Sequence, residues 1–164
     1  MRRASRNLVV LAIVAIVLVA AVLWIGRREY VRHPPTLTAL DPGSVTRIEL
    51  DIPAIASQTF ERRAGGWWRI KPSEAHADDA RVQRLARLAA TPVARWIPVS
   101  DITLSKVGLD HPSATLLLNG TRLEYGGLTA IDDLRYVRVG DQVALVPRQY
   151  SPEVMLTKPG AEQP

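Results

Sequence analysis

Few residues of this sequence have the type and spacing that catalysis requires. Asp110 and His111 are adjacent, as in an acid–base pair, but Pro112 follows them and Asp is common in turns, so a turn is the better interpretation. The histidines at 33, 76 and 111 are far apart, and none lies in a zinc-binding pattern such as H-E-x-x-H. There is no cysteine, and no serine lies in a G-x-S-x-G elbow. We therefore expect no enzymatic activity, no metal site and no cofactor.

Two groups of residues are candidates for contact with a partner. The first is the pair Trp67 and Trp68, because neighbouring residues of a strand point to opposite faces of a sheet. Only one indole can enter the core, and the other is exposed, covers an edge or meets a partner, since aromatic residues are enriched among interface anchors. The second is a row of arginines, Arg81, Arg84 and Arg87. This row could dock an acidic partner, although a solvated helix face is the commoner role for such residues.

A helix is predicted over residues 77–90, where it would carry the arginine row. Val82, Leu85 and Leu88 recur at helical spacing and form an apolar stripe on its other side. Asp78 or Asp79 can cap its first turn, where negative charge is favourable. Thr91-Pro92 ends it.

The other elements expected in the soluble part are strands. Residues 45–52 alternate between polar and apolar side chains, as a half-buried strand does. Asn119-Gly120 between two apolar runs is a strong hairpin signal, because both turn positions need a positive φ. Two further hairpins and one more strand-like segment are predicted from glycine-containing turns and β-prone residues, at 58–63 with 67–70, 135–139 with 142–146, and 93–99. Because strands come in blocks, the fold class expected is α+β with a mainly antiparallel sheet.

Residues 8–25 are consecutive apolar residues without charge, proline or glycine. A helix of this length approaches the thickness of a bilayer, so an N-terminal transmembrane helix over 8–26 is predicted. The short basic tail favours a cytoplasmic N-terminus, an inner-membrane location and a periplasmic or extracellular C-terminal domain. A cleaved signal peptide, with Val19-Ala20-Ala21 as its cleavage site, is the alternative; against it, the apolar run continues past this site.

The expected organisation follows from these elements. It comprises a cytoplasmic basic tail, the transmembrane helix, a juxtamembrane connector, a soluble α+β domain and a flexible C-terminal tail, at 1–7, 8–26, 27–44, 45–150 and 151–164. Of the 21 Lys and Arg, three precede the apolar run, which leaves 18 against 16 Asp and Glu in the rest. A nucleic-acid partner is therefore not expected, because such proteins concentrate basic residues on one face.

The order of motifs resembles a known family. Gly65-Gly66-Trp67-Trp68 followed by Pro72 and the helix from Ala77 looks like its first half, and Val107-Gly108-Leu109-Asp110 with the strands to Gly140 looks like its second half. The family is the bacterial envelope family catalogued as domain of unknown function 4340. The resemblance implies a membrane-anchored envelope protein without enzymatic activity; some members accompany gliding-motility-type ABC transporter components.

The function expected from the sequence is therefore binding. The chain is predicted to be a non-enzymatic single-pass membrane protein whose extracytoplasmic domain binds another envelope protein, such as an ABC transporter or a related assembly. The alternative is a membrane-tethered domain that binds a small molecule, a glycan or a lipid.

Overall fold

The computed structural model describes residues 15–20, 35–53 and 55–152. The chain divides into two units, Met1–Pro35 and Thr36–Pro164. In the first unit, residues 15–20 are helical. Their large apolar side chains are exposed, from 59% for Val19 to 68% for Ile16.

The fold class predicted from the sequence needs correction at this helix. In the described part of the chain, no helix has both the length and the apolar character that crossing a membrane demands. The remainder of the predicted span, residues 8–14 and 21–26, lies outside the described residues. The transmembrane helix is thus not supported, and the described fold is an antiparallel sheet with one helix.

The second unit is built on a nine-stranded sheet in which every pairing is antiparallel. The strands are β1 (Arg47–Ile52), β2 (Ile55–Arg63), β3 (Gly66–Lys71), β4 (Ala75–His76), β5 (Arg95–Pro98), β6 (Ala114–Leu118), β7 (Thr121–Leu128), β8 (Leu134–Val139) and β9 (Gln142–Pro147). The helix α2 (Asp79–Arg87) separates β4 from β5, and short 3-10 turns occupy Pro42–Ser44, Leu88–Ala90, Val99–Asp101, Leu104–Val107 and Arg148–Tyr150.

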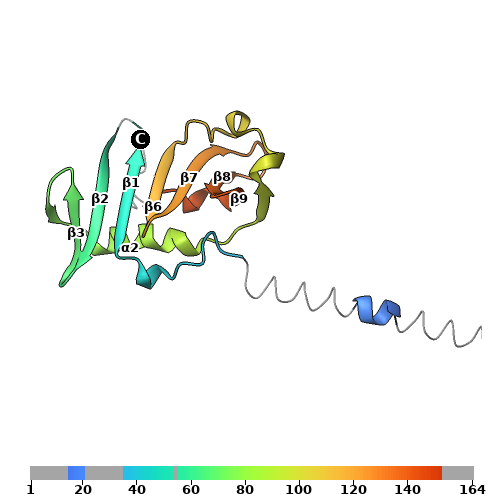
Figure 1. The fold of residues 1–164 in the computed structure, drawn as a ribbon, viewed down its shortest axis with the longest axis horizontal. Helices are drawn as coiled ribbons and strands as arrows, with labels where there is room; N and C mark the ends of the chain where they lie inside the picture. The colour runs from blue at the N-terminus through green and yellow to red at the C-terminus, as the bar shows by residue number, and fades with distance from the viewer. Residues whose placement is uncertain (1–14, 21–34, 54, 153–164) are drawn as a thin grey trace, which may run out of the picture. The chain divides into compact units, whose positions relative to one another are not determined.

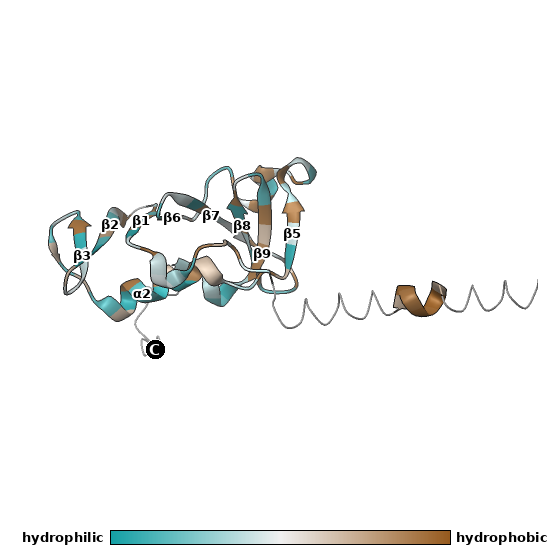
Figure 2. Ribbon diagram, turned by 60° about the horizontal axis from the view of Figure 1, so that its bottom comes forward, coloured by the Kyte–Doolittle hydropathy of each residue, from teal (hydrophilic) through white to brown (hydrophobic). Residues whose placement is uncertain are grey.

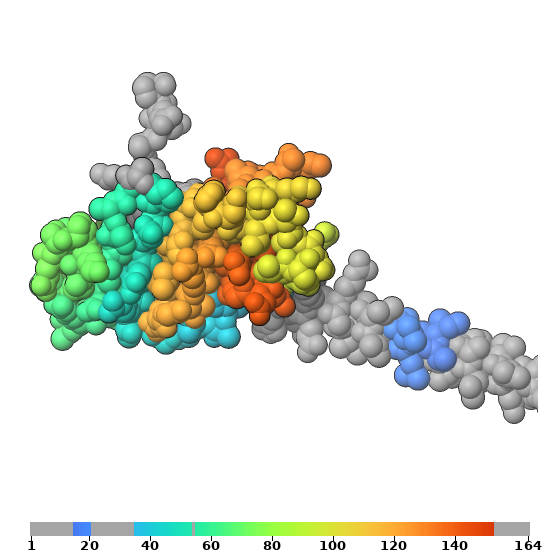
Figure 3. Space-filling view, turned by 45° about the horizontal axis from the view of Figure 1, so that its top comes forward, coloured from blue at the N-terminus to red at the C-terminus, as the bar shows by residue number. Residues whose placement is uncertain are grey.

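The strand order is β4-β3-β2-β1-β6-β7-β8-β9-β5, so two meanders meet at β1 and β6 in the middle of the sheet (Figure 1). Figure 3 shows this junction as the cyan residues of the first meander lying directly beside the orange residues of the second. The strand β5, which follows α2, crosses to the far edge and pairs with β9. The sheet therefore joins segments that are far apart in the sequence.

The hairpin predicted at Asn119-Gly120 is confirmed. The turn joins β6 to β7, and both residues have the positive φ that such a turn requires, 47° at Asn119 and 88° at Gly120. The side chain of Asn119 also reaches the start of β1, where its Oδ1 accepts from the backbone N–H groups of Thr46 and Arg47 at 3.0 Å. Its Nδ2 donates to the carbonyl of Ser44 at 3.1 Å, so one turn residue joins the two meanders.

One face of the sheet is covered by α2 (Figure 2). Asp78 caps the helix by accepting from the N–H of Arg81, as the sequence predicts. The predicted stripe is buried, with Val82, Leu85 and Leu88 at 1% exposure or less. They pack in one core with side chains of both meanders, among them Ile48, Leu50, Phe60, Leu116, Leu123 and Val137.

The folded unit begins earlier than residue 45. Thr36 forms a β-bridge with Pro92, and the N–H of Leu37 donates to the carbonyl of Thr91 at 2.8 Å. Leu37 is 2% exposed and belongs to the core. Part of the predicted connector 27–44 is therefore an integral part of the domain, because it covers the segment between α2 and β5.

Among the described residues, those that cover the opposite face of the sheet lie over the second meander. There, Leu109 and Val143 are buried outside the main core. A Cβ placed on Gly126 of β7 would lie 2.5 Å from the carbonyl oxygen of Val107. The loop 99–112 therefore packs directly on this half. Over β1–β4 the same face, named here the open face, carries polar side chains and Trp68.

Candidate functional site

The two adjacent tryptophans lie on opposite faces of β3. Trp67 is 2% exposed and belongs to the core on the helix side. Trp68 is partly exposed and pairs across the strands with Glu61 on β2 and His76 on β4. The prediction that only one indole enters the core is confirmed. Trp67 therefore offers almost no surface to a partner in the folded domain, whereas Trp68 offers some.

Trp68 is held between a cation and an imidazole. The guanidinium carbon of Arg63 lies 5.7 Å from the centre of its indole, within the range of a cation–π contact. The ring of His76 meets it edge-on, with centroids 5.4 Å apart and an interplanar angle of 67°. Because Arg63 also pairs with Glu74 at 2.6 Å, the indole is part of a connected surface group.

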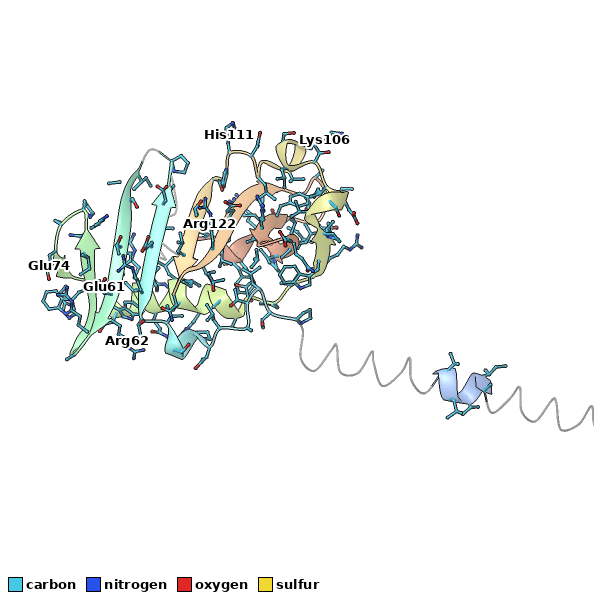
Figure 4. The ribbon with its side chains drawn as sticks, in the orientation of Figure 1. Glu61, Arg62, Glu74, Lys106, His111 and Arg122 are labelled. Carbon is cyan, nitrogen blue, oxygen red and sulfur yellow. The ribbon has the colours of Figure 1, made fainter. Side chains whose placement is uncertain are left out.

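A network of ion pairs surrounds Trp68 on the open face. Arg47 on β1 pairs with Glu49 and with Glu61, each at 2.8 Å, and Arg63 lies 4.0 Å from Glu61. The hydrogen bond and the charge of Glu49 raise the pKa of Arg47, which stays protonated in any case. Figure 4 shows Glu61 and Glu74 close together beside β2 and β3. These paired charges fix the surroundings of the indole, which stays partly exposed.

On the second meander, the same face of the sheet carries a different group. Glu124 of β7 is 16% exposed at its side chain and accepts from Arg122 at 2.8 Å, with Arg138 at 3.6 Å. Together with Gly140 these residues line an open depression of about 400 Å³. Its walls are charged and its carboxylate is already paired with two arginines. It therefore lacks the enclosed apolar lining typical of a small-molecule site.

The structure places the arginine row on the other side of the sheet from Trp68. Arg81 and Arg87 are exposed on α2, and Arg84 is half-buried between them. None of the three forms an ion pair or a side-chain hydrogen bond to another residue of the described ranges. The two candidate groups are therefore two separate surfaces, which the sheet keeps apart.

A second depression lies beside Trp67. A ligand pocket at this position would support the alternative function, the binding of a small molecule, a glycan or a lipid. It measures about 300 Å³ and is lined by Arg62, Gly66, Trp67, Asp79, Ala80 and Gln83. The depression is shallow and open rather than enclosed, and the indole beside it is buried. Asp79 is already bonded to the N–H of Trp67 at 2.6 Å. The geometry gives the ligand-binding alternative little support.

The residues considered for catalysis or metal binding are not gathered into one site. Asp110 and His111 form a turn, in which the N–H of His111 donates to Asp110 Oδ1 at 2.9 Å. His111 lies at the opposite end of the sheet from Arg62 (Figure 4). His76 contacts Trp68, and His33 lies outside the described residues. Within 15–20, 35–53 and 55–152, no three His, Cys, Asp or Glu side chains are close enough to hold a metal ion.

The sequence did not point to Arg63, Glu61 and His76 as neighbours of Trp68. Arg63 and Glu61 are two residues apart on β2 and therefore lie on the same face of the sheet. The register of β2 and β3, which places Trp68 opposite Glu61, would have identified both as neighbours of the indole. The contact with His76 depends on β4, a strand of two residues that is too short to show any periodicity.

Comparison of the chain with protein-family models, with curated proteins and with solved structures found no match in any of the three. The resemblance to the envelope family thus stays a prediction, and the case for function rests on the geometry of the two surfaces.

Proposed function

We propose that the folded domain is a protein-binding module that contacts its partner through the open face around Trp68. The observation that carries this proposal is the position of the indole. Trp68 lies on the uncovered half of the sheet, supported from two sides by Arg63 and His76. Tryptophan and arginine are the residue types most enriched among binding hot spots.

The surroundings of Trp68 suit a protein more than a small molecule. The surface is an open sheet face with paired charges around the indole, which matches the polar rim of a protein interface. Because Arg47, Glu61 and Arg63 are already oriented by ion pairs, few side chains need to be ordered on binding. The family resemblance supports an envelope protein, such as a transporter component, as the partner, and an extracytoplasmic location is part of the same proposal.

Co-purification tests this function. The full chain, its Trp68→Ala variant and a matched Arg122→Ala variant are tagged, expressed in the source cells and isolated after chemical crosslinking. Arg122 is the control because it lies on the same side of the sheet but on the second meander. We expect a defined protein to be enriched with the wild type and with Arg122→Ala and to be lost with Trp68→Ala, while all three proteins remain folded at the temperature of the experiment. Equal recovery of that protein with Trp68→Ala would refute the assigned surface.

A further inference from the structure

The arginines of α2 differ from several arginines of the sheet and its loops, because no carboxylate among the described residues pairs with them. On the sheet and its loops, each of several arginines has a carboxylate oxygen within 4.0 Å, namely Arg47, Arg63, Arg122, Arg138 and Arg148. Arg81, Arg84 and Arg87 have none among the described residues. The helix therefore presents three guanidinium groups whose charge the described domain does not compensate.

Arg84 carries a further sign of an incomplete environment. Its Nε is buried, and no acceptor for it is found in the described part of the chain. A buried donor without an acceptor is costly, because it has lost its hydrogen bond to water without a replacement. A carboxylate bound at the guanidinium would supply both the missing acceptor and the missing charge.

The helix dipole explains only part of this arrangement. Arg84 and Arg87 lie in the last turn of α2, where positive charge is favourable, and Asp79 lies in the first turn. Any positively charged side chain in the last turn would interact favourably with the helix dipole, even if it were fully solvated. The dipole accounts for the positive charge, but it does not account for the buried Nε of Arg84.

We propose that this row binds an acidic segment of a protein partner. The three arginines recur every third residue, so they span about 9 Å along the helix, a length that a short run of Asp and Glu side chains can match. Guanidinium groups form two parallel hydrogen bonds with a carboxylate, which makes arginine better suited than lysine to this recognition.

Two other anionic partners fit the helix less well. An interfacial helix inserts apolar side chains into a membrane, but Val82 and Leu85 of α2 are buried in the core. A nucleic acid needs a broad basic surface, whereas Asp78 and Asp79 lie at the start of this same helix. The proposed binding site for the acidic segment is also separate from the surface around Trp68, because that surface lies on the other side of the sheet.

Fluorescence anisotropy with a defined probe tests this inference. The probe is a labelled peptide of alternating Glu and Ala, and its control has Gln in place of every Glu. The purified full chain is compared with the triple variant Arg81→Gln, Arg84→Gln, Arg87→Gln and with Arg84→Lys, which keeps the charge at the helix end. Trp68→Ala serves as the control on the other surface, and a DNA duplex and phosphatidylserine vesicles are the competing anions.

We expect the Glu peptide to bind the wild type at least about tenfold more tightly than the triple variant, with an affinity that falls as salt is added. Arg84→Lys should lose several-fold in affinity without loss of thermal stability, and Trp68→Ala should bind as the wild type does. Equal binding of the Glu and Gln peptides would overturn the proposal. So would stronger arginine-dependent binding of the duplex or the vesicles, because the row would then recognise phosphate.

Discussion

The backbone N–H of Trp67 donates a 2.6 Å hydrogen bond to Oδ1 of Asp79, and this bond fastens the first turn of α2 to β3. The carbonyl of Trp67 accepts from the N–H of Ala77 at 2.8 Å, so both backbone groups of this edge residue are satisfied by the segment that enters the helix. The contact is close, since a Cβ on Gly66 would lie 2.8 Å from Asp79 Oδ2. It fixes β3 so that Trp67 enters the core and Trp68 faces outward.

Removing this carboxylate should destabilise the domain. Asp79→Ala leaves the part-buried N–H of Trp67 without its acceptor, and we expect the free energy of unfolding to fall by about 1–3 kcal/mol. Asp79→Asn keeps an acceptor oxygen and should lose less. Urea denaturation of both variants measures the difference, and equal losses would show that the hydrogen bond contributes nothing beyond the charge of Asp79 at the helix start.

Asn119 should be sensitive to replacement for two separable reasons. Its side chain bonds to Ser44, Thr46 and Arg47, and its φ of 47° is unfavourable for most residues. Asn119→Ala loses the bonds and strains the turn, whereas Asn119→Gly loses the bonds alone. We expect the alanine variant to be less stable than the glycine variant by about 1 kcal/mol, and both to be less stable than the wild type. A glycine variant as stable as the wild type would mean that the side-chain link between the meanders is dispensable.

Gly126 and Gly127 are adjacent on β7, but loop 99–112 packs more closely against Gly126, so substitutions at the two positions can be compared directly. A methyl group on Gly126 would meet the carbonyl oxygen of Val107 at 2.5 Å and Leu109 at 2.9 Å, but one on Gly127 would lie 3.4 Å from the same oxygen. Gly126→Ala should therefore cost about 1–3 kcal/mol of unfolding free energy and increase hydrogen exchange in the loop. Gly127→Ala should change stability by less than about 1 kcal/mol. The reverse order would contradict the described packing.

The two tryptophans should separate stability from binding. Trp67→Ala removes a buried side chain and should cost about 3–5 kcal/mol, enough to unfold many domains of this size. Trp68→Ala removes a partly exposed one and should cost about 1 kcal/mol, chiefly through lost contacts with Arg63 and His76. Chemical denaturation measures both losses. A larger loss for Trp68→Ala would show that its indole serves the fold.

Local signals predicted much of the second unit. The turn at Asn119-Gly120 and the cap at Asp78 depend on conformations that only a few residue types favour, so they can be predicted from short segments. The helix of the structure, α2 with its final 3-10 turn, lies within the predicted range 77–90. The strand predicted from alternation at 45–52 corresponds to β1.

Long-range pairing was beyond the reach of those signals. No turn joins β1 to β6 or β5 to β9, and their pairing is decided by which apolar faces share one core. For the same reason the sequence predicted two faces for Trp67 and Trp68 but could not assign them, because the contact of Asp79 with Trp67 is a tertiary one. The transmembrane helix was predicted from apolar length alone. The structure describes only residues 15–20 of that run and does not support the prediction.

The most direct test of the account is photocrosslinking in intact cells from a photoreactive residue at position 68, with the same residue at position 122 as the control. Mass spectrometry then identifies the adducts of each variant. We expect a specific protein adduct from position 68 and none of that protein from position 122. The absence of a protein adduct at 68, or the same adducts from both positions, would contradict the assignment of the open face around Trp68 as the binding surface.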